Sequence, residues 1–166
     1  MPELNDLLLK AAREGDEAAA RLAIDGGAAI DATNGVGSTP LVYAATNGHE
    51  ALVRRLIAAG ADIAHRTDFG QTALHQAAAW QHPAIVEILL DAGAAIDSVS
   101  DTGITALMIA AARGNMPLVH LLLERGAAVN HRDADGFNAW ACAAEKGNGD
   151  IAALLIERGA EPFILE

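Results

Sequence analysis

The residues best suited to catalysis or metal binding are few and scattered. The six histidines are dispersed along the chain, and the single cysteine, Cys142, can form neither an intramolecular disulfide nor a thiolate metal site. The three serines, at positions 38, 98 and 100, lie in turn-like segments without a nucleophile elbow. No phosphate-binding glycine loop and no His-Glu-x-x-His sequence occurs. The sequence therefore predicts a protein that is not an enzyme, with no catalytic residues, no metal and no cofactor.

Charge narrows the classes of partner. The 166 residues include 22 acidic residues against 11 lysines and arginines, a formal net charge of −11. Such a chain repels nucleic acid at long range, so a basic or neutral protein or peptide is the expected partner. No stretch reaches the roughly 18 apolar residues of a membrane span, and Met1 to Lys10 do not resemble a signal peptide. We expect an unprocessed, cytoplasmic monomer that contacts no membrane.

The elements that position side chains come from a repeat of 33 residues. Glycine followed by alanine recurs in register at Gly27, Gly60, Gly93, Gly126 and Gly159. A second series at the same period consists of residues that cap helix N-termini, and it predicts a helix start at each member: Asp6, Thr39, Thr72, Thr105 and Asn138.

Each predicted helix carries one apolar stripe. A large apolar residue follows the cap by two positions, and an alanine pair follows at i+3 and i+4, from Leu8 with Ala11/Ala12 to Trp140 with Ala143/Ala144. Glycine then ends the helix at positions 15, 48, 114 and 147, and only Gln81 breaks that series. A second apolar helix follows, and Asp/Asn-rich turns with glycine at 37, 70, 103 and 136 connect the units.

Three segments resemble the ankyrin repeat motif, whose period is also 33: Thr39-Pro40-Leu41, Thr72-Ala73-Leu74-His75-Gln76-Ala77-Ala78 and Gly126-Ala127-Ala128-Val129-Asn130. The resemblance implies an all-α solenoid of stacked helix-turn-helix units with projecting β-hairpin or turn loops. It implies a single domain over residues 1–166. Residues 1–33 form an N-terminal capping repeat with a solvent-facing side at Lys10, Arg13 and Glu14. Residues 34–66, 67–99 and 100–132 form full repeats, and 133–166 form a C-terminal cap that stops at Phe163–Glu166.

The resemblance also implies a concave groove formed by the loop tips and the exposed face of each first helix. By position, the predicted partner-binding residues are Val36, Tyr43, Asn47, Asp68, Phe69, Gln76, Trp80, Gln81, Asp101, Thr102, Ile104, Ile109, Arg113, Asp135, Phe137 and Lys146. We expect Phe69, Trp80 and Arg113 to be the anchors, because aromatic and arginine side chains dominate binding hot spots.

Several alternatives stay open at this point. Trp80 alone is also consistent with a packed structural residue. Asp68, Asp101 and Asp135 are consistent with an acidic rim or with ordinary turn aspartates. The expected function is a protein–protein interaction module, either a general adaptor or a bacterial inhibitor or immunity protein that covers the active site of a toxin or enzyme. A structural or regulatory fragment of a longer repeat protein is a further alternative.

Overall fold

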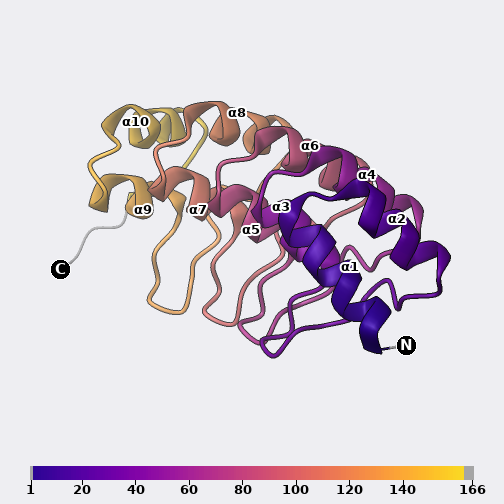
Figure 1. Ribbon diagram of the computed structural model, residues 1–166. Coiled ribbons are helices and arrows are strands. Elements are labelled where there is room, and N and C mark those ends of the chain that lie inside the picture. The colour runs from indigo at the N-terminus through magenta and orange to yellow at the C-terminus, as the bar shows by residue number, and fades with distance from the viewer. Residues whose placement is uncertain (1, 163–166) are drawn as a thin grey trace. The chain divides into compact units, whose positions relative to one another are not determined.

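The computed structural model describes residues 2–162, and this part of the chain is built from helix pairs joined by turns (Figure 1). The predicted end of the C-terminal cap, Phe163–Glu166, lies outside the described residues. The helices are α1 (Pro2–Glu14), α2 (Glu17–Asp25), α3 (Pro40–Thr46), α4 (Glu50–Ala58), α5 (Ala73–Ala79), α6 (Pro83–Asp91), α7 (Ala106–Ala112), α8 (Met116–Glu124), α9 (Ala139–Glu145) and α10 (Gly149–Glu157).

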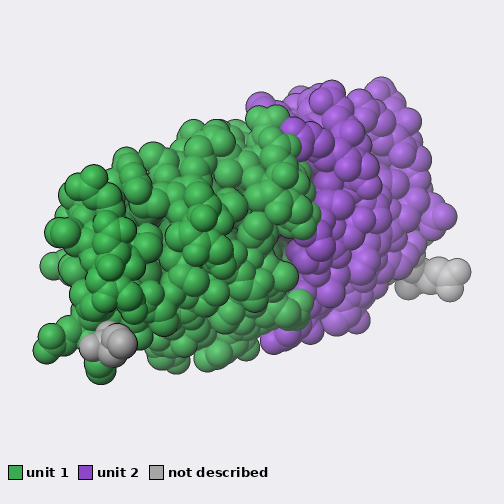
Figure 2. Space-filling view, turned by 90° about the vertical axis from the view of Figure 1, so that its right-hand side faces the viewer, with its two compact units in different colours: residues 1–94 green, residues 95–166 purple. Residues whose placement is uncertain are grey.

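The chain divides into two compact units, residues 1–94 (unit 1) and 95–166 (unit 2) (Figure 2). In unit 1, α1 packs against α2 and α3, while α3 packs against α4 and α5, and α5 against α6. In unit 2, α7 packs against α8 and α9, and α9 against α10. Within each unit the first helix of every pair lies on the side of the projecting loops (Figure 1). The all-α solenoid fold is therefore as predicted, whereas one domain over residues 1–166 stays a prediction.

Helix starts follow the predicted capping residues with one exception. The side-chain oxygens of Thr39, Thr105 and Asn138 accept a backbone N–H three residues further on, at 3.3, 3.3 and 3.0 Å. The predicted start at Asp6 is wrong, because α1 begins at Pro2 and places Asp6 one turn inside the helix. Proline fits the first turn of a helix and Glu3 interacts favourably with the helix dipole there, so α1 extends toward the N-terminus.

The core follows the predicted apolar stripe. The large apolar residues of the three middle repeats are buried, namely Leu41, Leu74 and Leu107. The alanine pairs that follow them are fully buried. Alanine allows helix backbones to approach closely, which is why short helices can stack here. In the last pair the stripe opens, since Ala144 is exposed and Trp140 is only half-buried. Among the described residues, α9 has a neighbouring first helix, α7, on one side only.

The projecting loops are tight turns rather than paired strands. Each is closed by two backbone bonds at its first residue. The N–H of that residue reaches the carbonyl four residues later, as from Thr67 to Gln71 at 2.9 Å, and its carbonyl accepts the N–H of the glycine three residues later, as from Gly70 at 2.8 Å. No strand occurs within residues 2–162, because these bonds close a turn and no further pairs continue them into a ladder. Of the two loop forms predicted, β-hairpin or turn, the structure shows the turn.

Histidine side chains bond to backbone carbonyls both within a repeat and between consecutive repeats. His65 Nε2 donates to the carbonyl of Gly37 at 2.8 Å, and His131 Nε2 donates to that of Gly103 at 3.0 Å. His49 and His82, which precede α4 and α6, reach back to Arg13 and Thr46 carbonyls at 3.2 and 3.1 Å. Because a carbonyl only accepts, each Nε2 must carry the proton. These four rings thus have structural bonds, and no group of three or more potential metal ligands occurs among the described residues.

Gly48 offers a test of this packing. Its φ is +80°, and a Cβ added there would lie 2.8 Å from Cε1 of His82. We expect Gly48→Ala to lower the free energy of unfolding by about 2 kcal/mol, from left-handed strain plus the clash. Gly60→Ala is the matched control, because Gly60 has φ +88° with no atom within 4 Å of the added Cβ, and should cost only about 1 kcal/mol. Urea unfolding measures both, and equal losses would show that the His82 contact is unimportant.

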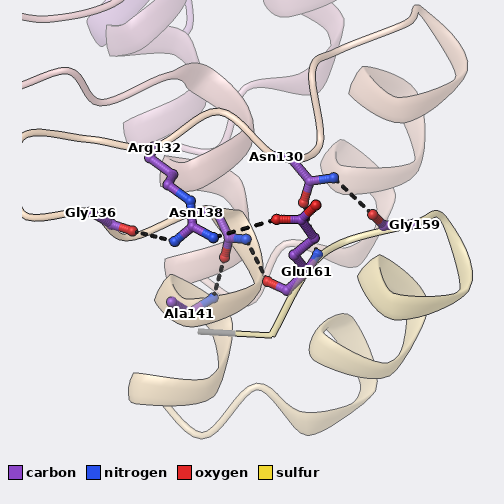
Figure 3. Close-up of polar contacts among 7 residues, drawn as sticks. All are labelled: Asn130, Arg132, Gly136, Asn138, Ala141, Gly159 and Glu161. Carbon is purple, nitrogen blue, oxygen red and sulfur yellow. Dashed lines mark hydrogen bonds and ion pairs between the residues drawn. The ribbon is translucent and has the colours of Figure 1, made fainter. Parts of the chain in front are cut away.

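A polar network secures the end of unit 2 (Figure 3). The fully buried Asn138 caps α9 through its Oδ1 and donates from Nδ2 to the carbonyl of Glu161 at 2.8 Å. Asn130 donates to the Gly159 carbonyl and accepts the Glu161 N–H, both at 2.8 Å. Arg132 pairs with the Glu161 carboxylate at 3.6 Å. The segment after α10 is therefore bound to the loop before α9.

Candidate partner-binding surface

A hollow of about 430 Å³ in unit 1 runs along the ends of the first helices and their loops. We call it the unit 1 groove. Six of its lining residues were predicted from the sequence: Val36, Tyr43, Asn47, Phe69, Gln76 and Trp80. The other six were not: Arg13, Ser38, Val42, Thr46, Thr67 and Gln71. Asp68 and Gln81, also predicted, are exposed but do not line the hollow.

The groove exposes large apolar side chains. Phe69 is 64% exposed, Trp80 is 58% exposed and Val36 is 44% exposed. Trp80 caps the C-terminus of α5, where its N–H donates to the Gln76 carbonyl. Its side chain is exposed, so Trp80 is not the packed structural residue that the sequence left open as an alternative. Gln81 follows at φ +62°, so glutamine adopts the left-handed conformation that glycine supplies in the other repeats. Three such side chains on one hollow are unusual on a free surface, and clustered apolar exposure marks interaction sites.

Tyr43 is held in place by a residue that the sequence reasoning did not single out. Asn34 Nδ2 donates to Tyr43 Oη at 2.6 Å, and Asn34 Oδ1 accepts the N–H groups of Val36 and Ser38 at 3.0 and 2.9 Å. The Asn34 side chain therefore closes the loop through its Oδ1 and orients Tyr43 through its Nδ2. An asparagine at the first position of a turn was the available signal.

Charge on the groove is sparse and positive. Arg13, from α1, is the one charged residue among its lining side chains. Its guanidinium lies 3.6 Å from Glu14, and both side chains are at least half exposed. Arg13 was expected on the solvent-facing side of the N-terminal repeat; its place in the groove depends on how α1 packs beside α3. The 33-residue period could have predicted the place of Arg13 in the groove, because Arg13 precedes Thr46 by one period and Thr46 also lines the groove.

A smaller hollow of about 250 Å³ adjoins the first on α1. Arg13 and Tyr43 line both hollows, and the remaining lining residues are Asp6, Leu9, Lys10 and Asn34. Arg13 and Tyr43 therefore lie at the junction between the apolar groove and the smaller hollow.

The predicted residues of unit 2 lie on α7, α9 and their loops. Thr102, Arg113 and Lys146 are exposed, as are Asp101 and Asp135, whereas Ile104, Ile109 and Phe137 are half-buried. In the loop before α9, the carboxylate that accepts turn N–H groups belongs to Asp133, which bonds Phe137 and Asp135 at 2.8 and 3.0 Å. The acidic rim of Asp68, Asp101 and Asp135, and one groove over all repeats, stay predictions.

The family model described as ankyrin repeats (3 copies) matches residues 8–100 and again residues 92–164. The chain belongs to the ankyrin repeat family. Ankyrin repeats are in general protein–protein interaction modules and typically have no enzymatic activity. A search of curated proteins found no match. Among residues 2–162 of this ankyrin repeat protein, no helix has the length and apolarity needed to cross a membrane.

Cys142, on α9 of this ankyrin array, is half-buried. Burial, with the negative charges of Asp133 and Glu145, raises the pKa of its thiol from 9.0 to about 11. Since the thiolate is the reactive form, we expect the folded protein to react with a disulfide reagent at pH 8 about 100-fold more slowly than the unfolded chain. Equal rates in buffer and in guanidinium chloride would contradict this expectation.

The same shift predicts a pH dependence of stability. The folded state holds the thiol proton more tightly, so this contribution is complete below about pH 9 and is lost as the pH rises toward 11. Unfolding free energies of the protein and of Cys142→Ala, compared at pH 8 and pH 10.5, isolate the effect from other groups. We expect the unfolding free energy of the native protein to fall more between pH 8 and pH 10.5 than that of Cys142→Ala.

Proposed function

We propose that this protein is a non-enzymatic binding module that holds a protein or peptide partner in the unit 1 groove. The observation that carries the proposal is the exposure of Phe69 and Trp80 on one hollow together with Val36. Water contact with these side chains is unfavourable, and covering them with a partner would recover that free energy.

The surface beneath the groove supports tight binding because it is preformed. Leu41 and Leu74 are buried on α3 and α5, the helices that carry lining residues of the groove, and Asn34 fixes Tyr43. A rigid, packed base loses little conformational entropy when a partner binds. The side chains that change most on binding are then the exposed aromatics themselves, which have few rotatable bonds.

Affinity capture with the folded protein as bait tests the proposal. The native protein and the double variant Phe69→Ala/Trp80→Ala are compared with Leu22→Ala, which removes an equally exposed apolar residue (64%) from α2, outside the groove. We expect partners held by the native protein and by Leu22→Ala to be lost from the double variant. Retention by the double variant, or loss with Leu22→Ala alone, would place the binding surface elsewhere.

The captured partner also separates the two kinds of interaction module. An enzyme or toxin whose activity falls to zero at a one-to-one ratio would make the protein an inhibitor. A partner whose activity is unchanged when bound would make it an adaptor.

A further inference from the structure

We infer that the occupant of the unit 1 groove is an extended, uncharged segment of the partner, recognised by an apolar side chain and by a main-chain amide. The inference rests on the proposed function and specifies the chemistry of the partner. It narrows the basic or neutral partner that the net charge of −11 suggests to a neutral segment.

The first support is the absence of an unpaired charge in the groove. Among its lining residues only Arg13 is charged, and the Arg13 guanidinium lies 3.6 Å from the Glu14 carboxylate. A charged group of an occupant would meet this ion pair, which attracts it through one member and repels it through the other. It would also give up bound water without gaining a partner of opposite charge. A neutral segment avoids this cost.

The second support is that three polar side chains of the groove already bond within the protein. Thr46 Oγ1 donates to the carbonyl of Val42 at 2.7 Å. Asn47 Nδ2 donates to the carbonyl of Tyr43 at 2.9 Å. Thr67 Oγ1 accepts two N–H groups of its own loop, at 3.4 and 3.3 Å. Because these bonds turn polar atoms toward the protein's own backbone, the exposed apolar side chains supply much of the contact that the groove offers.

The third support is a pair of side-chain amides close to the two aromatics. Gln71 follows Phe69 by two residues, and Gln76 precedes Trp80 by one helical turn. Both glutamines line the groove, and Gln76 Nε2 donates to Gln71 Oε1. Each amide has a donor and an acceptor, so this bond leaves Gln71 Nε2 and Gln76 Oε1 without a partner among residues 2–162.

One residue of an extended segment satisfies both groups. Its N–H and its carbonyl point to the same side of the chain, so the N–H donates to Gln76 Oε1 and the carbonyl accepts from Gln71 Nε2. A helical segment cannot do this, because its N–H and carbonyl groups are bonded within the helix. An aromatic or large aliphatic side chain of the same segment then covers Phe69 and Trp80.

A random peptide library displayed on phage supplies the probe. It is selected on the folded protein near physiological salt and, in parallel, on Phe69→Ala/Trp80→Ala. We expect peptides enriched only on the native protein to share an aromatic or large aliphatic residue flanked by uncharged residues. A shared charge of either sign would overturn the inference and leave the proposed function standing. Equal enrichment on both baits, or none on either, would count against the proposed function itself.

Salt and Arg13 test the absence of a charge contribution. We expect the affinity of the selected peptide to change by less than about twofold between about 0.05 and 0.5 M NaCl. Arg13→Ala should likewise change the affinity by no more than about twofold, because the arginine is already paired with Glu14. A loss of about fivefold or more in either measurement would show that a charged contact holds the peptide, and would overturn the inference.

N-methylation of the selected peptide, one residue at a time, tests the main-chain contact. We expect one N-methyl position to weaken binding to the native protein about fivefold, and Gln76→Leu to weaken binding of the unmodified peptide by a similar factor, since each removes one hydrogen bond. On Gln76→Leu the same N-methyl group should cost no more than about twofold, because the bond is already lost. The absence of a sensitive position, or two losses that add fully, would overturn the inference.

Discussion

Replacement of Asn138 by alanine is expected to lower the free energy of unfolding by about 3 kcal/mol, a large fraction of the stability of a domain this size. The side chain is fully buried and serves two elements, the N-terminus of α9 and the backbone of Glu161 (Figure 3). Loss of an N-terminal cap alone costs about 1 kcal/mol. The rest comes from the lost bond to the Glu161 carbonyl, about 1 kcal/mol, and from the space that the deleted buried side chain leaves in the core.

The chain offers its own control for this prediction. Threonine occupies the equivalent position in the three preceding repeats, as at Thr39 and Thr105, so Asn138→Thr keeps the cap but removes the amide donor. We expect about half the loss of the alanine variant. Urea unfolding gives both values, and hydrogen exchange should show faster exchange over residues 149–161 in the alanine variant than in the native protein. A loss of less than 0.5 kcal/mol for the alanine variant, or no loss for the threonine variant, would show that the bond to Glu161 contributes little.

Removal of both groove aromatics is expected to weaken partner binding by about a hundredfold or more. A central aromatic at an interface contributes about 2 kcal/mol or more on truncation, which is about 30-fold in affinity. Phe69 and Trp80 line one hollow, so the two losses should not add fully. Titration of the captured partner with Phe69→Ala, Trp80→Ala and the double variant measures the losses and their coupling.

The same variants should leave the fold unchanged. Both side chains are more than half exposed, so the midpoint of thermal unfolding should move by no more than about 2 °C. A loss of affinity accompanied by a similar loss of stability would indicate that the aromatics support the fold. Affinity unchanged in the double variant would show that the partner binds another surface.

Local features were predictable from the sequence for a local reason. Capping by Thr39, Thr105 and Asn138 joins atoms three residues apart, and left-handed glycines such as Gly48 depend only on their own φ. Gln81, which breaks the glycine series in the sequence, has φ +62° and so keeps the conformation that glycine has at this place in the other repeats. The prediction at Asp6 failed for a local reason too, since Pro2 and Glu3 provide an earlier helix start.

The groove could be predicted only in part. The exposure of Phe69 and Trp80 follows from their repeat positions, which lie outside the buried stripe of alanines. The place of Arg13 in the groove depends instead on the packing of α1 beside α3. Charge at a site is set by which side chains the fold gathers there, not by composition.

The sequence by itself determined the period, the helix pairs, most of their starts and ends, and the family, because each of these depends on bonds or patterns within one 33-residue repeat. Only the tertiary structure decided the contacts between repeats: the rings of His49 and His82 on preceding carbonyls, and Arg13 with Tyr43 at the junction of the two hollows. These contacts join residues about one period apart. Their partners are set by the stacking of one repeat on the next, which no pattern inside a single repeat specifies.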